Sequence, residues 1–484
     1  MKAMYKLRSA TATTTLAICL LAICGCQGVK STGGGPPPPP PPDITSVNHI
    51  IFMAQENRSF DMYFGQLPAY WAANGFPSQQ FDGMPTNASN PSFDGKTTVP
   101  AFHLATVCVE NLTPSWDESH LDWNLQDPLS STATMDGFVY NAAKFGRDEG
   151  YTDTEGQRAM GYYDGTDLNY YYFMASNFAT SDRWYAPALD RTQINRMYLF
   201  AATSQGYAYP PGTDAADNGP LTVPTIFDAL QKAGVTWKVY YSDDICSSTP
   251  PDATFPKGGI AHDSNAGACT YLTQFANYTP PNPLPANVVP VSQYLTDVQN
   301  GTLPSVAFIE TGYMSGRDEH PSSGTNIQTG AAYVQSLIDP LMNSVSWKDS
   351  VFILTYDEPG GIYDHVPPMT APSPDGIAPI DLQPNDICTT GTAPTCNFQT
   401  SGFRVPLLVV SPFTKKNFVS HTSADYTAIL KFIETRFNVP SLTKRDAAQM
   451  DMTEFFDFQG EPWMTPPTTP TQSTSGVCDA QKLQ

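Results

Sequence analysis

The feature that most constrains this chain is a short apolar run, residues 50–53, that passes directly into the polar residues Glu56-Asn57-Arg58-Ser59. A short run with β-branched residues is typical of a buried strand in an α/β sheet. In such sheets, binding sites lie beyond the carboxyl ends of the strands. We therefore expect Glu56 and Asn57 to stand where a metal ion or a phosphate could be bound. The same residues could instead cap a helix or lie in a solvated loop.

Four further segments show the same change from apolar to polar residues. They are 236–241 before Ser242-Asp243-Asp244, 305–309 before Glu310, 350–356 before Asp357, and 405–410 before Ser411. Between these segments lie three helix-like stretches, at 222–233, 327–342 and 423–437. Strands that alternate with helices indicate a mostly parallel sheet covered on both faces. We therefore predict an α/β fold, a three-layer α/β/α sandwich with a mostly parallel central sheet, whose strand-end carboxylates gather at one edge.

A second polar cluster follows the longest strand-like segment. Asp357 and Glu358 stand side by side there, and two glycines, Gly360 and Gly361, come almost directly after them. Hard cations prefer oxygen ligands, and glycines allow a close approach of the backbone. This acid pair is therefore a candidate half of a metal site. A pair in such a setting can also cap a turn or a helix, so the segment by itself leaves both interpretations open.

A third cluster, residues 190–196, combines charged residues with Thr192. A threonine hydroxyl can act as a nucleophile when a metal lowers its pKa. Arg191 and Arg196 could hold phosphate oxygens through forked hydrogen bonds, and Asn195 is a further candidate for substrate binding. The alternative is a surface segment without a chemical role, which is the usual setting of a threonine between charged residues.

Three of the seven histidines have an acid close by that could orient them for proton transfer. His120, His320 and His365 each follow an aspartate or glutamate within three positions. We treat these three as candidate catalytic residues. His49, at the start of the first strand-like run, is expected to be structural.

The chain begins with the features of an exported protein. Basic residues near the start precede an apolar run from Ala10 to Ile23, which is typical of a secretory signal and too short to span a membrane. Cys26 follows in a lipobox-like setting, although Cys24 stands where a small residue such as alanine is more usual. We expect export with a lipid anchor on Cys26 that attaches the chain to a membrane; periplasmic or secreted release is the alternative.

The composition divides the rest of the chain into three parts. After a signal over 1–26, a Gly/Pro-rich linker over 27–43 ends in a run of prolines and forms a stiff spacer. Residues 44–464 are enough for one large α/β domain with insertions or for two domains, and we assign them to the catalytic domain. The Thr/Pro/Ser-rich stretch 465–484 is expected to be a tail that lies over the surface.

Six cysteines remain after the signal region, and an even number in an exported chain favours disulfides over metal thiolates. Sequence alone leaves other connectivities open. The pairs that we expect are Cys388–Cys396 around a short Thr/Gly/Pro loop, Cys246–Cys269, and Cys108–Cys478, which would tie down the tail.

The formal charge of the chain is −21, from 25 Lys and Arg against 46 Asp and Glu. Nucleic acids need a cationic surface, so this charge argues against them as partners. A small phosphate ester is not excluded, because a bound metal can reverse the local field inside a cleft.

Taken together, these stretches resemble the bacterial phosphoesterase family, which contains phospholipases C and related acid phosphatases of the alkaline phosphatase-like superfamily. The resemblance extends from Val47 to about Asp446 and implies the alkaline phosphatase-like α/β/α architecture. It rests on the order and spacing of nine motifs, namely Glu56 to Asp61, Ser119-His120, Met135 to Phe138, Thr192 to Arg196, Glu319 to Pro321, Thr355 to Glu358 with Gly360-Gly361, Tyr363 to Pro368, Gly402 to Pro406, and Leu430 to Glu434.

The resemblance also implies roles for the candidate residues. Thr192 would be the nucleophile. One divalent metal ion, with calcium, zinc, magnesium and manganese as open alternatives, would be bound by Glu56, Asn57, Asp357 and Glu358. His120, His320 and His365 would surround the phosphate, either as hydrogen-bond donors or as the acid that protonates the leaving oxygen.

Two departures from the family pattern lie around the nucleophile. Ile194 stands where the family often has proline, and Leu189-Asp190-Arg191 replaces a glycine-proline approach. These changes keep Thr192 in place but alter the substrate contacts expected around it.

The sequence therefore predicts an exported, metal-dependent phosphoesterase. A phospholipase C-type reaction on phospholipid is the first candidate, because the N-terminal tether would hold the domain close to a membrane. An acid phosphatase acting on small phosphomonoesters is the alternative, since we expect none of the accessory C-terminal domains of the larger haemolytic phospholipases. A non-catalytic lipid-binding lipoprotein is disfavoured, because the nucleophile and the metal acids are all present.

Overall fold

A computed structural model describes residues 43–210, 219–242, 270–278, 285–311, 316–322, 324–389 and 396–484. The expected signal, the lipobox Cys26 and the linker up to residue 42 lie outside these residues, as does the expected Cys246–Cys269 pair. Residues 42–484 form one compact unit.

The core of this unit is an eight-stranded sheet in the order β13-β6-β12-β11-β1-β10-β8-β9. Its strands are β1 (His49–Gln55), β6 (Ala179–Ser181), β8 (Trp237–Tyr241), β9 (Val288–Pro290), β10 (Val306–Ile309), β11 (Ser350–Tyr356), β12 (Leu407–Val410) and β13 (Phe418–Ser420). Strand β1 lies between β10 and β11, with Ile51 beside Ala307 on one side and Phe352 on the other. Residues 50–53 are fully buried, as expected for a strand covered on both faces.

The prediction of a mostly parallel sheet is confirmed. Strands β8, β9, β10, β11 and β1 pair in parallel, whereas β12 runs antiparallel to both β11 and β6. The expected strand 405–410 begins only at Leu407, because Pro406 has no N–H to donate to a neighbouring strand. The strands that end in Glu56, Glu310 and Asp357 all point the same way, so their terminal acids meet at one edge.

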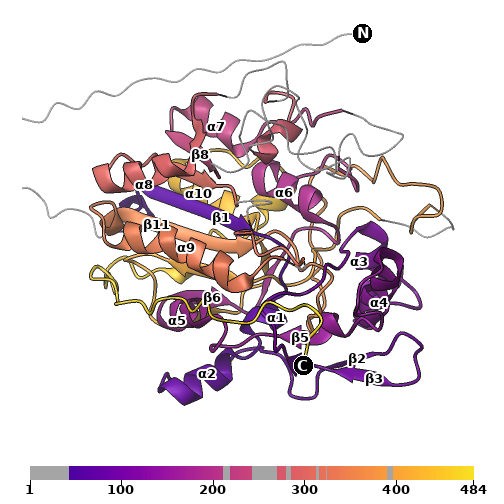
Figure 1. The fold of residues 1–484 in the computed structure, drawn as a ribbon. Coiled ribbons are helices and arrows are strands. Elements are labelled where there is room, and N and C mark those ends of the chain that lie inside the picture. The colour runs from indigo at the N-terminus through magenta and orange to yellow at the C-terminus, as the bar shows by residue number, and fades with distance from the viewer. Residues whose placement is uncertain are drawn as a thin grey trace, which may run out of the picture. The chain divides into compact units, whose positions relative to one another are not determined.

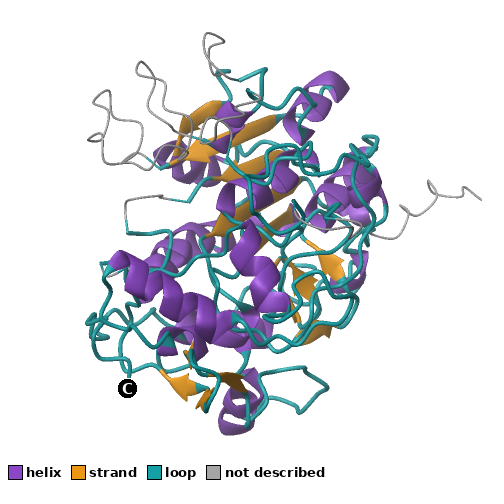
Figure 2. Cartoon of the chain, turned by 90° about the vertical axis from the view of Figure 1, so that its right-hand side faces the viewer, coloured by secondary structure: helices purple, strands orange, loops and turns teal. Residues whose placement is uncertain are grey.

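Two groups of helices cover the sheet, which confirms the three-layer arrangement. Helices α5 (Asn169–Asn177), α8 (Val291–Asn300) and α9 (Ile327–Met342) pack together, and α6 (Thr192–Ala201), α7 (Ile226–Ala233) and α10 (Ala428–Phe437) form the other group. Figure 1 shows the sheet between them. The arrow of β1 points to the right in Figure 1, and Figure 2, which looks onto that side, shows it covered largely by loops.

Helices α7 and α10 begin later than the sequence predicts. Thr225 caps α7, with its hydroxyl accepting from Asp228 N and the Asp228 side chain bonding back, which sets the first turn at Ile226. Residues 424–425 form a strand instead of helix, and Asp425 then accepts the N–H of Thr427 just before α10. The capping box sets the start of α7, whereas the pairing of residues 424–425 with β7 delays the start of α10.

The remaining α-helices and strands lie outside the eight-stranded sheet and the two helix groups. They comprise α1 (Phe60–Phe64), α2 (Leu67–Asn74), α3 (Trp116–Trp123), α4 (Phe138–Glu149), α11 (Lys444–Ala447) and the strand pairs β2 (Ser89–Pro91) with β3 (Thr98–Pro100), β4 (Phe102–His103) with β5 (Gly161–Tyr162), and β7 (Trp184–Tyr185) with β14 (Ala424–Asp425). Within the described ranges, no helix combines the length and the apolar character needed to cross a bilayer.

The tail is fastened to the domain at several points. Gln472 donates to the backbone oxygen of Asp167 at 2.8 Å, and Gly476 N donates to Gln328 at 2.8 Å. The expected disulfides Cys108–Cys478 and Cys388–Cys396 are both formed.

Candidate active site

The end of β1 places Glu56 and Asn57 inside the domain. Glu56 is fully buried and Asn57 is 3 % exposed, so neither lies in a solvated loop. Asn57 adopts a left-handed backbone with φ of 58°, which turns the chain sharply away from the strand. In this turn, the backbone N–H of Asn57 donates to Asp357 Oδ1 at 3.0 Å, and thereby joins the ends of β1 and β11.

The acid pair at the end of β11 faces this turn. Asp357 Oδ1 also accepts the backbone N–H of Glu358 at 2.8 Å, and both side chains are fully buried. Gly360 N donates to Glu358 Oε2. A Cβ on Gly360 would lie 2.7 Å from the backbone oxygen of Asn57, so the close approach expected of this glycine is present.

Thr192 is the first residue of α6 and lies against these acids. Its hydroxyl is 3.3 Å from Glu56 Oε2 and 3.3 Å from Asn57 Oδ1, and the residue is 7 % exposed. The start of a helix carries partial positive charge from the helix dipole and has backbone N–H groups without partners in the helix. Both features favour the binding of anions. Arg191 is the N-cap residue of α6.

Two of the expected substrate-binding residues instead hold the site together. The Asn195 side chain accepts from Ala188 N at 3.0 Å and donates to the Asp190 oxygen at 2.6 Å, which braces the loop before Thr192. Arg196 is fully buried, and its Nη2 donates to Glu56 Oε1 at 2.5 Å. Its Nε lies 3.4 Å from Asp357 Oδ2. Arg196 is therefore a counter-charge for the acids.

The charges in this cluster are out of balance. Glu56, Asp357 and Glu358, which we call the acid cluster, are three buried carboxylates. The Arg196 guanidinium pairs with Glu56 and Asp357 and lies 3.8 Å from a fourth carboxylate, Glu310, whereas the positive charge that acts on Glu358 comes from Arg191. Burial raises the pKa of Glu56 well above its usual range despite Arg196, and burial together with the charge of Asp357 does the same for Glu358. Among the described residues, Asp357 Oδ2 and Glu358 Oε1 have no hydrogen-bond partner. Buried carboxylate oxygens in this state suit a hard cation.

His320 lies beside the acid cluster. Its backbone N–H donates to Asp318 Oδ1 at 3.2 Å, and Nδ1 lies 2.8 Å from the Pro321 oxygen. Because a carbonyl only accepts, Nδ1 carries the proton in this contact. Burial lowers the pKa of His320, although the charges of Asp318 and Asp357 oppose this. Asp318, one of the acids close to His320 in sequence, thus binds its backbone, whereas the Pro321 oxygen holds the ring at Nδ1.

Glu319, next to His320, points to a different set of partners that we call the tyrosine cage. Its carboxylate accepts hydrogen bonds from the hydroxyls of Tyr63 (2.6 Å), Tyr171 (2.6 Å) and Tyr356 (2.8 Å) and from Gln55 Nε2 (3.1 Å). Glu319 has a left-handed φ of 68°, which sends its side chain and that of His320 to different places. Nothing in the sequence marked this cage, because its tyrosines are scattered along the chain.

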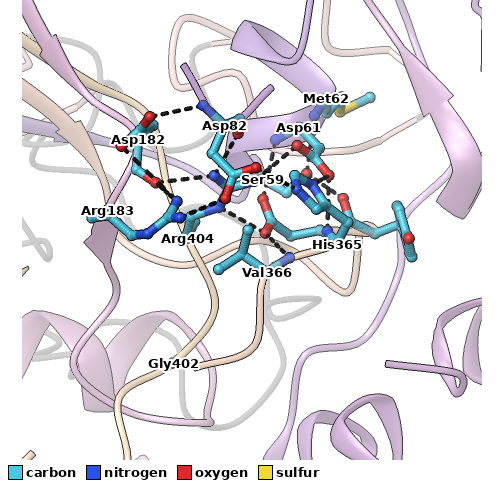
Figure 3. Close-up of polar contacts among 12 residues, drawn as sticks. Ser59, Asp61, Met62, Asp82, Asp182, Arg183, His365, Val366, Gly402 and Arg404 are labelled. Carbon is cyan, nitrogen blue, oxygen red and sulfur yellow. Dashed lines mark hydrogen bonds and ion pairs between the residues drawn. The ribbon is translucent and has the colours of Figure 1, made fainter. Parts of the chain in front are cut away.

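His365 belongs to a network of charged residues at the loops after β1 and β11 (Figure 3). Its Nδ1 lies 2.7 Å from Asp61 Oδ2 and its Nε2 lies 3.1 Å from Asp82 Oδ1. Burial would lower the pKa of His365, but the bond to Asp61 and nearby negative charge outweigh it and raise the pKa. Both ring nitrogens thus donate to carboxylates, and the orienting acid is Asp61 instead of the expected neighbour in sequence.

In the part of the chain that the structure describes, two groups of acids with a histidine could hold a cation by their spacing, namely Asp61–Asp364–His365 and the partly exposed His103–Asp164–Asp167. In the first group, the buried guanidinium of Arg404 already binds Asp61 at 2.9 Å and Asp364 at 2.8 Å. Arg404 therefore supplies the positive charge there, and the network ties together the two loops that carry the acid cluster.

His120 lies on α3, with Trp116 as its hydrogen-bond partner. Nδ1 is 2.6 Å from the Trp116 oxygen, and Nε2 is 4.0 Å from the disulfide sulfur of Cys396. Burial lowers the pKa of His120 to about 4. The structure thus brings Glu56, Asn57, Thr192, Arg196, Asp357, Glu358 and His320 together, whereas the hydrogen bonds of His120 and His365 lie with other residues.

Proteins of known activity resemble this chain over most of its length. Phospholipase C B of Mycobacterium tuberculosis is 30% identical over 447 residues, which cover 87% of this chain and 79% of that protein. Hemolytic phospholipase C of Pseudomonas aeruginosa is 29% identical over 450 residues, covering 86% of this chain and 57% of that protein. Among solved structures, a protein in the alkaline phosphatase superfamily from Vibrio parahaemolyticus aligns with 80% of this chain and 78% of its own at 13% identity and a TM-score of 0.31.

The family itself is shown by a match along the domain. The sequence model of the Phosphoesterase family matches residues 47–440, which include both halves of the acid cluster, Thr192 and the three candidate histidines. This agrees with the resemblance seen in the sequence motifs. The chain belongs to the phosphoesterase family and is a hydrolase that acts on phosphoester bonds.

Proposed function

We propose that this chain cleaves the phosphodiester of a phospholipid by a phospholipase C-type reaction in which Thr192 is the nucleophile. The observation that carries the proposal is the position of the Thr192 hydroxyl, 3.3 Å from both Glu56 and Asn57 at the start of α6. The names of the relatives, which are phospholipases C, support the substrate class.

A divalent metal ion would be held by Glu56, Asn57, Asp357 and Glu358. Asp357 and Glu358 each have one oxygen without a hydrogen-bond partner among the described residues, and this and the excess of buried negative charge support the assignment. A bound divalent ion supplies positive charge for phosphoryl oxygens and makes a nearby hydroxyl more acidic.

The chain's own residues would handle the substrate as follows. Thr192 Oγ1 forms a bond to phosphorus while the ester bond breaks, and the proton lost by the Thr192 hydroxyl passes to the oxygen of the leaving alcohol. The N-terminal amides of α6 stabilise negative charge on the phosphoryl oxygens. His320 Nε2 exchanges the proton with the leaving oxygen or with the water that later attacks phosphorus. That water releases phosphate monoester and restores the Thr192 hydroxyl.

Thr192→Ala tests this proposal, with Thr192→Ser as the matched control. We expect kcat to fall about 10³-fold or more in the alanine variant and to recover in part with serine, because only serine retains a hydroxyl. Release of p-nitrophenol from p-nitrophenyl phosphorylcholine and from p-nitrophenyl phosphate measures both activities. Full activity in Thr192→Ala would refute the nucleophile, and preference for the monoester would assign an acid phosphatase instead.

The location of the enzyme is part of the same proposal. The leader and Cys26 support export with a lipid anchor, and the disulfides Cys108–Cys478 and Cys388–Cys396 suit an oxidising compartment. The mass of the mature N-terminal peptide tests this: an unmodified Cys26 would exclude the anchor.

A further inference from the structure

A cavity of about 420 Å³ lies beside the loop that carries Thr192, and the reaction described above leaves it unused. Its wall is rich in large apolar side chains, namely Trp116, Trp123, Leu129, Leu189 and Phe398. No described residue of the lining is an aspartate, glutamate, lysine or arginine. Most of the remaining lining is polar but uncharged, with Ser130, Asn397 and Gln399 among it. A cavity of this size that combines large apolar side chains with uncharged polar groups suits a small organic ligand.

The cavity is built directly onto the nucleophile loop. Leu189 of its wall is three residues before Thr192. The fully buried Arg445 donates to the backbone oxygen of Phe398 at 3.0 Å and also to that of Pro187, and so fixes the cavity wall to the loop. The Phe398 ring also packs on Tyr198 of α6. The cavity and the nucleophile therefore share one rigid support.

The two indoles present ring surface to the cavity, because their N–H groups are engaged. Trp116 Nε1 donates to the Ile387 oxygen at 3.1 Å, and Trp123 Nε1 donates to the Ser130 oxygen at 3.0 Å. The indoles therefore offer apolar and aromatic contact in place of hydrogen bonds.

His120 gives this apolar wall one oriented polar atom. Since the Trp116 oxygen can only accept, the His120 Nδ1 carries the proton. Nε2 of the neutral ring then holds a lone pair, and the disulfide sulfur of Cys396, 4.0 Å away, has no proton to donate. The cavity thus offers a hydrogen-bond acceptor at Nε2, which is the opposite of the donor role expected for His120 from the family resemblance.

We propose that this cavity binds the uncharged organic part of the phosphate ester, as an apolar or aromatic group that bears a hydroxyl or N–H, and that His120 Nε2 accepts its hydrogen bond. The assignment rests on the proposed function, because it treats the cavity as a substrate subsite next to Thr192. Trp116, Trp123 and Phe398 then determine which esters are preferred, and His120 selects those whose organic part can donate.

Binding can be tested without turnover. Benzyl alcohol and toluene share a ring and differ in the hydroxyl donor. In the full chain labelled with ¹⁵N-histidine, we expect a saturable shift of the His120 Nε2 resonance with benzyl alcohol and none, or a much smaller one, with toluene. The resonance is assigned by its loss in His120→Gln. The absence of a saturable shift with benzyl alcohol, or equal shifts with both probes, would overturn the proposal.

Specificity is tested with Trp123→Leu, with Phe173→Leu on α5 as an aromatic control in another layer. The measured quantity is the ratio of kcat/KM for p-nitrophenyl phosphorylcholine to that for methyl phosphorylcholine, a diester that lacks a ring. We expect about a tenfold fall in this ratio for Trp123→Leu and none for Phe173→Leu. An unchanged ratio in Trp123→Leu would overturn the subsite. If the wild-type chain hydrolyses neither ester, the proposed function fails, and the NMR titration still decides whether the cavity binds.

Discussion

Two sites with buried carboxylates adjoin the ends of β1 and β11. One is the tyrosine cage around Glu319, and the other is the acid cluster. In the tyrosine cage, both oxygens of Glu319 accept hydrogen bonds from tyrosine hydroxyls. In the acid cluster, Asp357 and Glu358 each retain one oxygen without a hydrogen-bond partner among the described residues. Both groups are equally buried, so the difference lies in their partners and not in their exposure to water.

Strand geometry explains how neighbours in sequence reach such different surroundings. Gln55 and Tyr356 are paired in register, and both side chains bond to Glu319. The next residue on each strand points to the opposite face of the sheet. Those residues are Glu56 and Asp357, which enter the acid cluster.

The comparison separates two uses of a buried charge. A carboxylate with all its hydrogen bonds made holds the fold together, whereas one with unpaired oxygens weakens the fold unless a ligand completes it. We therefore expect mutations in the acid cluster to abolish activity with little loss of stability, and mutations in the tyrosine cage to do the reverse.

The largest effect is expected for Asp357→Asn in the acid cluster. The amide oxygen can still accept the N–H groups of Asn57 and Glu358, so the loops stay joined, but one negative charge is lost. We expect kcat/KM to fall about 10³-fold or more, and the unfolding midpoint in chelator to stay the same or rise. Activity within tenfold of wild type would break the comparison, because the unpaired oxygen would then have no functional role.

A loss of stability of about 3 kcal/mol is expected for Glu319→Gln in the tyrosine cage. The amide nitrogen of glutamine would face donors such as the Tyr171 hydroxyl and Gln55 Nε2, and these would lose their acceptor. Urea unfolding measures the change, and Tyr63→Phe, which removes one hydroxyl, should cost only about 1 kcal/mol. Inactivation of a fully stable Glu319→Gln variant would show instead that the cage serves the chemistry directly.

The parts of the site that sequence could predict are those set by local patterns. An apolar run followed by acids marked the ends of β1 and β11, and strand direction then brought Glu56 and Asp357 together. Thr192 was found through its charged neighbours and the motif order. These features depend on residues close in the chain, which is why their placement agrees with expectation.

The parts that sequence missed depend on contacts between distant residues. His365 is oriented by Asp61, 304 positions away, and not by Asp364 beside it. Tyr63 and Glu319 are 256 positions apart, so no local pattern reveals their bond. The antiparallel direction of β12 and the bracing role of Asn195 likewise follow from packing of separate segments.

The smallest change in stability is expected for Glu434 on α10. This residue also tests whether a buried carboxylate oxygen without a hydrogen-bond partner always indicates function. Ser441 donates to its Oε2 at 2.6 Å, while its Oε1 has no hydrogen-bond partner within the described residues. Burial raises the pKa of Glu434 to about 9, and Asp446 adds to this effect through a side-chain hydrogen bond and its negative charge. Glu434 resembles the acid cluster in having an oxygen without a hydrogen-bond partner, but its neighbours are Ser441 and Asp446, and the mechanism does not use it.

The sign of its pH dependence follows from proton binding. The folded chain keeps the Glu434 proton up to about pH 9, whereas the unfolded chain releases it near the ordinary value of 4.5. The folded state therefore binds more protons between these values, and its contribution to stability is lost as pH rises through them.

Glu434→Gln keeps a neutral group at every pH, so we expect equal stability at about pH 4 and a gain of about 1 kcal/mol at about pH 8, discounted for partial solvent screening. Urea unfolding at the two pH values measures this, and kcat should not change. A large loss of activity would mean that an unpaired buried carboxylate marks function even here, far from Thr192 in the chain.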